Sequence, residues 1–172
     1  MNTHIARIHE LVTTLNLHRH PEGGWYSEVH RSSSRVTPVA DGRNQRSALT
    51  AIYFLLELDH FSAWHKVLSD EVWIYLEGNP LDLWTWDASN NIAKCVNLGP
   101  LNAHIRPQHT VPAGIWQAAK PQAEQHGAGY TLVACTVGPG FEFDDFEMMK
   151  PAGADAARLA HSWPQLAAFI PV

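Results

Sequence analysis

The stretch HKVLSDEVWIYLEG, residues 65–78, contains the spacing on which the fold assignment depends. His65 and Val67 are separated by one residue, Glu71 follows after three more, and Gly78 after a further six. Ser69-Asp70 is a turn signal between two apolar runs. The stretch therefore predicts two short β-strands joined by a turn, with His65 at the end of the first and Glu71 at the start of the second.

The rest of the chain continues this pattern of short strands separated by turn residues. The predicted strands cover residues 25–31, 47–58, 61–67, 71–76, 81–86, 92–96, 104–111, 115–119, 130–137 and 141–149. Helices do not alternate with them, which argues against a parallel sheet. Many short strands at this spacing are typical of an all-β sandwich or barrel.

Both ends of the chain favour helix. Apolar residues recur at helical spacing near the start, at Ile5, Ile8, Leu11, Val12 and Leu15. The tail is rich in alanine and predicts one or two short helices. We therefore expect a single domain over residues 1–172, with an N-terminal helix in 1–20, a β-barrel over 24–149 and a helical tail over 152–172.

Two polar segments, residues 32–46 and 120–129, interrupt the strand pattern. Either could cover the mouth of a barrel, although solvated surface loops are the more common reading of such segments. His18 and His20 precede Pro21 in a third segment. Such a pair could bind a metal, although histidines in exposed loops usually have no such role, and we expect these two to be exposed loop residues.

Composition excludes several classes of function. Of the 172 residues, 45% are hydrophobic and 17% are charged, which is the balance of a globular chain. The formal net charge of −5 argues against binding to nucleic acid or to an anionic membrane. The N-terminus lacks the features of a secretory signal, and no apolar run approaches the length of a membrane span. The expected location is the cytoplasm.

A second motif, VPAGIWQ at residues 111–117, supports a family assignment. Together with the first motif it resembles, in spacing and order, the two motifs of the cupin superfamily. Four longer segments are similar to the uncharacterised cupin family DUF985, also called Cupin_5: PEGGWYSEVHRS (21–32), SDEVWIYLEG (69–78), VPAGIWQAA (111–119) and GPGFEFDDFEM (138–148). This resemblance implies an all-β jelly-roll barrel, the double-stranded β-helix, and a homodimer. It implies no established reaction.

The metal-binding residues of the cupin pattern are only partly present. The resemblance implies three histidines and a glutamate, but Val67 and Gln117 stand where two of the histidines belong. His65 and Glu71 remain, and Gln117 is a poor ligand. We therefore expect no cofactor. The alternative is a divalent metal held by His65, Glu71 and Gln117, supplemented by His30 or another residue brought in by folding.

Strand parity predicts the contents of a pocket. Side chains alternate between the faces of a strand, so Trp73 and Tyr75 share the face of Glu71. A mainly apolar interior with a few polar groups is the usual composition of a small-molecule site. The candidate catalytic residues are His65 and Glu71, and the candidate ligand-binding residues are Gln117, Glu28, Trp73, Tyr75 and Tyr53.

Several of these roles have alternatives. Trp73 also fits a core position, and either tyrosine could act as an acid if its hydroxyl reaches the cavity. The segment 24–30 is similar to the first strand of sugar-nucleotide epimerases of the cupin class, where the acidic residue lies at the substrate pocket. Glu28 could equally pair with an arginine on the surface.

Three hypotheses of function follow. The first is a metal-independent cupin that binds a small molecule, as a carbohydrate- or nucleotide-related isomerase or epimerase. In this hypothesis His65 is the base, Glu71 orients it and Gln117 donates to a substrate oxygen. The second is a non-catalytic ligand-binding or sensory cupin, in which the His65–Glu71 pair is structural. The third is a metal-dependent enzyme with a reduced set of ligands.

Overall fold

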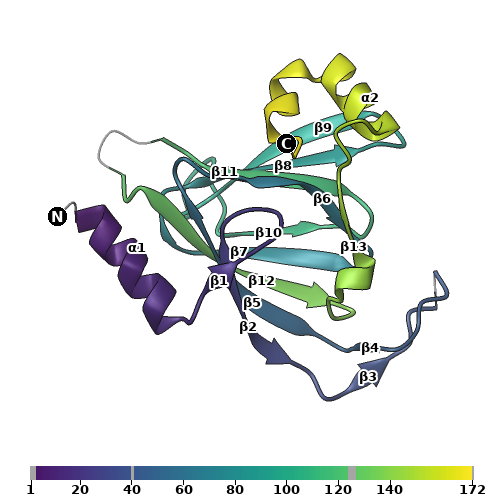
Figure 1. Ribbon diagram of the computed structural model, residues 1–172, viewed down its shortest axis with the longest axis horizontal. Coiled ribbons are helices and arrows are strands. Elements are labelled where there is room, and N and C mark those ends of the chain that lie inside the picture. The colour runs from purple at the N-terminus through teal and green to yellow at the C-terminus, as the bar shows by residue number, and fades with distance from the viewer. Residues whose placement is uncertain (1–2, 40, 124–126, 172) are drawn as a thin grey trace.

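Two β-sheets facing each other make up most of the protein (Figure 1). The computed structural model describes residues 3–39, 41–123 and 127–171. Sheet 1 has the strand order β1-β2-β5-β12-β7-β10, and sheet 2 has the order β13-β6-β11-β8-β9. Every strand pair within these sheets is antiparallel. The all-β prediction is therefore confirmed.

Sheet 1 consists of β1 (His18–Arg19), β2 (Trp25–Arg31), β5 (Thr50–Glu57), β7 (Asp70–Gly78), β10 (Gln108–Val111) and β12 (Tyr130–Gly138). Sheet 2 consists of β6 (Ser62–Val67), β8 (Leu81–Asp87), β9 (Ile92–Leu98), β11 (Trp116–Pro121) and β13 (Phe146–Met148). The helical elements are α1 (Thr3–Thr14), η1 (Phe143–Asp145), α2 (Ala154–Ser162) and η2 (Pro164–Phe169).

Helices cover the outer faces of both sheets (Figure 1). The apolar side of α1 packs on sheet 1, where Leu11 lies in one cluster with Leu55 and Leu132. At the other end of the chain, Leu159 of α2 and Phe169 of η2 pack in a cluster on sheet 2. The helices predicted at both ends of the chain therefore act as outer layers of the barrel.

The space between the sheets is filled at one end by a dry cluster. Its members are buried apolar side chains: Phe54, Leu56, Trp73, Leu81, Leu83, Leu98, Val111, Ala119, Val133 and Cys135. The parity argument is confirmed on β11, where Ala119 faces this cluster while Trp116 and Ala118 face α2 and η2. Alternation along β11 therefore divides its side chains between the dry cluster and the cluster under α2 and η2.

Several observed bounds differ from the predicted ones. The predicted strand 104–111 begins only at Gln108, because the Asn102 side chain accepts the backbone N–H groups of His104 and Ile105 and closes a turn. The predicted strand 141–149 begins with η1. The N-terminal helix ends at Thr14, and β1 already pairs with β2. Of the ends of the predicted single domain, residues 1, 2 and 172 lie outside the described residues.

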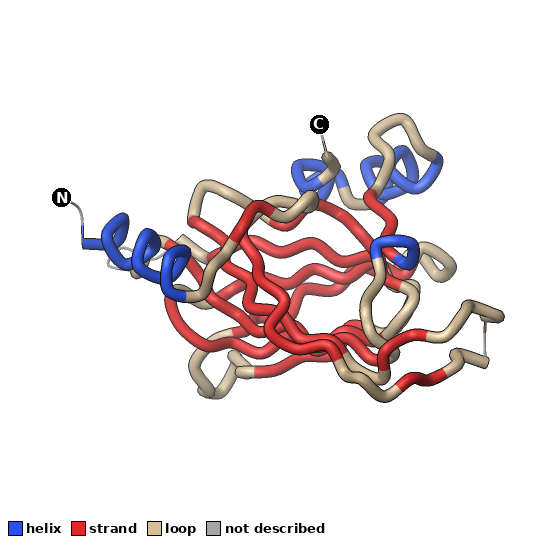
Figure 2. The backbone as a smooth tube through the Cα atoms, turned by 60° about the horizontal axis from the view of Figure 1, so that its bottom comes forward, coloured by secondary structure: helices blue, strands red, loops and turns tan. Residues whose placement is uncertain are grey.

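The polar segment 32–46 contains a short hairpin of β3 (Arg35–Val36) and β4 (Arg46–Ser47), which projects from the barrel (Figure 2). Two arginines tie this segment to η1. Arg46 donates two hydrogen bonds of 2.7 Å to the buried carboxylate of Asp145, and Arg43 donates a third of 2.9 Å. The two guanidinium groups lower the pKa of Asp145. No helix within the described part of the chain is long and apolar enough to span a bilayer.

Candidate functional site

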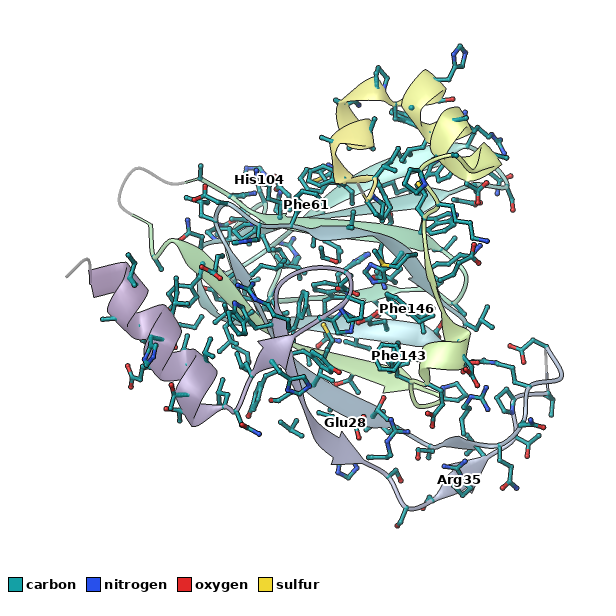
Figure 3. The ribbon with its side chains drawn as sticks, in the orientation of Figure 1. Glu28, Arg35, Phe61, His104, Phe143 and Phe146 are labelled. Atoms are coloured by element: carbon teal, nitrogen blue, oxygen red, sulfur yellow. The ribbon has the colours of Figure 1, made fainter. Side chains whose placement is uncertain are left out.

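A cavity of about 280 Å³ lies between the sheets and adjoins the dry cluster, whose Phe54 and Cys135 contribute to its lining. Strands β2, β5, β6, β7 and β12 contribute to its lining, together with the N-terminal segment and residues 141–146. Figure 3 shows Phe143 and Phe146 beside each other at the β13 end of this space, with Glu28 on β2. The candidate site is built around the polar groups at the base of this cavity.

Glu22 enters the cavity because a tight turn before β2 packs against β6. The turn is closed by hydrogen bonds between His20 and Gly24 and between Gly23 and His20. The backbone N–H of Ala63 donates to the carbonyl of Glu22 at 2.8 Å. Gly23 has φ +111°, and a Cβ there would lie 2.3 Å from the carbonyl oxygen of Phe61, so only glycine fits. The turn thereby places Glu22 beside the end of β6.

The carboxyl group of Glu22 lies between two imidazoles. Its Oε1 accepts a hydrogen bond of 2.8 Å from the hydroxyl of Ser62. Its Oε2 lies 3.3 Å from Nε2 of His65 and 3.4 Å from Nδ1 of His20. Glu22 and His65 are buried, and both line the cavity together with His20.

The hydrogen-bond partners of the two imidazoles locate a proton on Glu22. Nδ1 of His65 lies 2.8 Å from the carbonyl oxygen of Ala63, which can only accept, so Nδ1 carries the ring proton. Nδ1 of His20 accepts the backbone N–H of Glu22 at 3.3 Å. In neutral rings, both nitrogens that face Oε2 are therefore acceptors. A carboxylate would repel them, whereas a carboxylic acid can donate its proton to His65.

Burial favours the same protonation states. Desolvation raises the pKa of Glu22 to about 8, against a lowering contribution from the Ser62 hydroxyl. Desolvation also lowers the pKa of His65, although the charge of Glu71 opposes that shift. The pKa of His20 is lowered to about 3 by burial and by the two neighbouring histidines, His65 and His18. These shifts favour a neutral carboxyl group on Glu22 and a neutral imidazole on His65 near neutral pH, with Oε2 and Nε2 3.3 Å apart.

A second buried network lies beside this one. Nε2 of Gln117 donates to Oε2 of Glu71 at 2.6 Å, and Oε1 of Gln117 accepts the indole N–H of Trp73 at 3.0 Å. Burial raises the pKa of Glu71, and the nearby Glu22 contributes to the same shift. Both ends of the Gln117 amide are therefore occupied by protein groups.

The wall of the cavity is aromatic. Phe141, Phe143 and Phe146 contact one another, with ring centroids 5.1 to 6.2 Å apart. Phe146 also lies 5.4 Å from the ring of His65 and 5.8 Å from the ring of His20. The segment around η1 therefore closes one side of the cavity with apolar rings.

An ion-pair cluster lies on the lining near the solvent. Arg31 forms a two-pronged pair with Glu28, with N···O distances of 2.9 and 2.8 Å, and pairs with Glu142 at 2.7 Å. All three residues line the cavity; Glu28 and Arg31 are exposed, and Glu142 is partly buried. The two alternatives for Glu28 are thus found together, because it lines the pocket and also pairs with a surface arginine.

The other predicted site residues lie away from the cavity lining. Tyr53 packs in the cluster beneath α1, and the hydroxyl of Tyr75 donates to the carbonyl of Gly78 at 2.6 Å. Trp73 lies in the dry cluster and His30 is exposed on β2. The structure therefore brings together His65, Glu71 and Glu28, and it places Gln117 behind Glu71. Their functional roles stay predictions.

Sequence reasoning missed His20 and Glu22. His20 was expected in an exposed loop, but its side chain is only 6% exposed because it packs among Tyr26, Phe54 and Phe146. A signal was present, since Glu22 lies in the segment 21–32 that carries the family resemblance. Its meaning depends on a contact with β6, about 40 residues along the chain, which no local pattern shows.

The fold and these motifs define the chain as a cupin, and comparison with known proteins identifies its branch. Residues 9–149 match the family model Cupin_5, Cupin superfamily (DUF985), so the chain belongs to this family. An uncharacterised protein of Saccharomyces cerevisiae is 25% identical over 154 residues, which cover 84% of this chain and 76% of the yeast protein.

Solved structures agree with this assignment. A hypothetical protein from Leishmania major is 36% identical and superposes with a TM-score of 0.80 over 94% of this chain and 95% of its own. A protein from Shewanella oneidensis is 30% identical, with a TM-score of 0.75 over 94% and 92% of the two chains. Oxalate decarboxylase of Bacillus subtilis, at 13% identity and a TM-score of 0.54 over 91% of this chain and 38% of that one, shares the fold alone. The jelly-roll prediction is confirmed.

The residues at the cupin metal position do not fit a metal centre. Val67 offers no donor atom, and both polar atoms of Gln117 are engaged by Trp73 and Glu71. Within residues 3–39, 41–123 and 127–171, no group of three or more His, Cys, Asp or Glu side chains is arranged to hold a metal ion. We therefore derive no chemical step through a metal.

Proposed function

We propose that this protein binds a small molecule in the barrel cavity and transfers protons within it, as an isomerase or epimerase does. One observation carries the proposal. The Oε2 atom of Glu22 lies 3.3 Å from Nε2 of His65 inside a cavity, and the contact of Nδ1 of His65 with the carbonyl oxygen of Ala63 leaves Nε2 able to share a proton with Glu22. A carboxyl group and an imidazole that share one proton form an acid–base pair.

The proposed reaction conserves protons and electrons. The pair releases its shared proton to an oxygen of the ligand and becomes a carboxylate next to a neutral imidazole. It then takes a proton from the carbon adjacent to the carbonyl carbon, and the C–H electrons form the new double bond of an enol. The pair returns a proton to the other face of the same carbon or, where the intermediate is an enediol, to the former carbonyl carbon, and it takes back the proton of the hydroxyl group that becomes the carbonyl. The pair ends with the one proton it had at the start, and no cofactor is required.

Glu71 and Gln117 have supporting roles in this proposal. The charge of Glu71 favours the protonated form of His65, so Glu71 increases the basicity of the imidazole. Gln117 keeps Glu71 in place through a hydrogen bond of 2.6 Å. The sequence-based hypothesis assigned the orientation of His65 to Glu71 and substrate contact to Gln117, whereas the geometry favours Glu22 and Ala63 as the direct partners of His65.

Exchange of carbon-bound hydrogen with solvent tests the proposal. Small carbonyl compounds, including sugars and ring ketones, are incubated with the protein in deuterated water and followed by NMR and mass spectrometry. We expect deuterium at the carbon next to a carbonyl for at least one compound. The exchange should fall at least about 100-fold in Glu22→Gln and in His65→Gln. Glu147→Gln, on the outer side of β13, is the matched control.

A second candidate is a cupin that binds its ligand without changing it. The observation in its favour is the closed network of Glu71, Gln117 and Trp73, whose polar groups are satisfied within the protein. A ligand that raises the melting temperature, is recovered unchanged and exchanges no deuterium would support this candidate over catalysis.

Metal analysis of protein purified without a histidine tag tests the metal-dependent alternative. Association into a homodimer stays a prediction, which light scattering tests.

A further inference from the structure

We infer that the ligand of the barrel cavity is a compact ring compound that carries no negative charge, with one polar group directed at the base of the cavity. This inference deepens the proposed function and rests on it, because it names the class of molecule that the same cavity selects. It is carried by the size of the cavity, its aromatic wall and the charges along its lining.

The size of the cavity limits the ligand to a small molecule. Ligand pockets in proteins have volumes of about 300 to 1,000 Å³, and this one, at about 280 Å³, lies at the lower end. A single ring with a short substituent fits such a volume. A sugar nucleotide, with a base, two further rings and a diphosphate, exceeds it.

The wall of the cavity favours a ring with an apolar face. Phe141, Phe143 and Phe146 form the η1 side, and Tyr26 and Phe54 lie on the strands that face them. Phe143 is 51% exposed, so other protein atoms cover its ring only in part. A ring placed against these side chains buries apolar surface and can stack or pack edge to face. At the base, Glu22 and His65 can receive one polar group of the ligand, while the Glu28, Arg31 and Glu142 cluster lies nearer the solvent.

The charges along the lining disfavour an anion. Glu28 and Glu142 line the cavity near its entrance, against the single guanidinium group of Arg31. The buried Glu22 and Glu71 also line it, but burial raises the pKa of both carboxyl groups. That guanidinium group is already bonded to Glu28, to Glu142 and to the carbonyl oxygen of Phe141. The described lining contains no lysine and no second arginine.

These charges argue against a nucleotide ligand, which the first sequence-based hypothesis included. A phosphate group is usually held by arginine, lysine or a helix N-terminus with open N–H groups. The cavity offers one arginine, which already makes four hydrogen bonds to Glu28, Glu142 and Phe141, and a phosphate near the entrance would face Glu28 and Glu142. These carboxylates attract a cationic group and do not repel a neutral one.

Three probes of equal ring size and different charge test the inference. Benzyl alcohol is neutral, benzylammonium is cationic and benzoate is anionic, and their dissociation constants are measured by NMR titration at low ionic strength. We expect benzyl alcohol and benzylammonium to bind, with benzoate at least about tenfold weaker than benzylammonium. The difference should shrink near 1 M salt, where the Debye length is about 3 Å. Uridine diphosphate glucose should not bind.

Two variants and a control assign the effects to the residues named. Glu142→Gln should reduce the difference between benzylammonium and benzoate, whereas Phe143→Ala should weaken all binding probes by a similar factor. Glu147→Gln, which lies outside the cavity lining and pairs with Lys66, should change neither property.

The outcomes separate this inference from the proposed function. Binding of benzoate or uridine diphosphate glucose as tightly as benzyl alcohol would overturn the inference, and so would failure of all three ring probes to bind. Proton transfer is tested independently by deuterium exchange. Ring probes that bind with the expected charge order, together with no exchange in any compound, would therefore contradict the proposed catalysis and leave the inferred ligand class supported.

Discussion

The two ends of the space between the sheets are built from the same strands but have opposite character. On β5, Leu56 lies in the dry cluster while Thr50 and Ile52 line the cavity. Phe54, between them, belongs to the cluster and also contributes to the lining. On β7, Trp73 belongs to the dry end and Glu71 to the cavity. The division therefore runs across the strands, and a shift of two residues along one strand changes the environment from apolar packing to a polar site.

This comparison shows how the barrel tolerates buried titratable groups. Leu81, Leu83 and Leu98 are fully buried in the dry cluster, where close packing stabilises the fold. At the cavity end, Glu22, His65 and Glu71 are buried as well, which costs desolvation free energy. The dry end offsets that cost, so the cavity end can retain groups whose pKa values are shifted, as functional sites often do.

The largest effect on stability is expected at the dry end. Leu83→Ala removes a side chain with no exposed surface and leaves a cavity among Leu81, Leu98 and their neighbours. The free energy of unfolding should fall by about 3 kcal/mol, measured by urea denaturation. Leu76→Ala, at a leucine that is 44% exposed, is the matched control and should cost less than about 1 kcal/mol. An equal loss of unfolding free energy in Leu83→Ala and Leu76→Ala would contradict the assignment of the stabilising core to the dry cluster.

The boundary between the two ends is tested at Gln117. Gln117→Leu leaves the indole N–H of Trp73 without its acceptor and removes a donor from Glu71, both in buried positions. Buried groups without partners cost about 1 to 3 kcal/mol, so we expect a loss of about 2 kcal/mol in the free energy of unfolding. Gln108→Leu, at an exposed position on β10, should change it by less than about 0.5 kcal/mol. A gain in stability for Gln117→Leu would show that the network is not needed for folding.

The cavity end should make stability depend on pH. The folded protein keeps the Glu22 proton up to a pKa of about 8, whereas the unfolded chain releases it near 4.5. The folded state therefore binds more protons between these values, and the free energy of unfolding falls as pH rises through this window. Between pH 6.5 and 8.5 the contribution from Glu22 should be about 2 kcal/mol.

Glu22→Gln removes this contribution while keeping the shape of the side chain. The free energy of unfolding of the wild type, relative to that of Glu22→Gln, should therefore fall as pH rises from 6.5 to 8.5. Denaturation curves measured at several pH values test this. Glu147→Gln should follow the wild-type curve. Parallel curves for wild type and Glu22→Gln would mean that Glu22 ionises outside this window.

The smallest effect on stability is expected at the aromatic wall. Phe143 is 51% exposed, so Phe143→Ala should lower the free energy of unfolding by less than about 1 kcal/mol. The same change should weaken ring probes, because it removes one side of the cavity. A loss of stability as large as that of Leu83→Ala would place Phe143 in the core of the fold and not in a ligand wall.

Local patterns predicted most of the strands because alternation and turn residues act over a few positions. The strand from Trp25 to Arg31 was predicted with its observed bounds, and the start of β8 at Leu81 follows from the turn before it. The errors have local causes that propensity does not show. The Asn102 side chain closes a turn in place of a strand, and η1 follows the turn that contains Pro139 and Gly140.

The sequence by itself determined the barrel and the positions of His65 and Glu71, because motif spacing and strand parity are properties of neighbouring residues. It also showed that Val67 and Gln117 replace two expected metal ligands. Only the tertiary structure decided which carboxyl group meets His65. The turn at Gly23 packs against β6 through contacts that span about 40 residues, and this packing inserts Glu22 between two imidazoles. The chemistry of the site depends on that long-range contact, which no local pattern encodes.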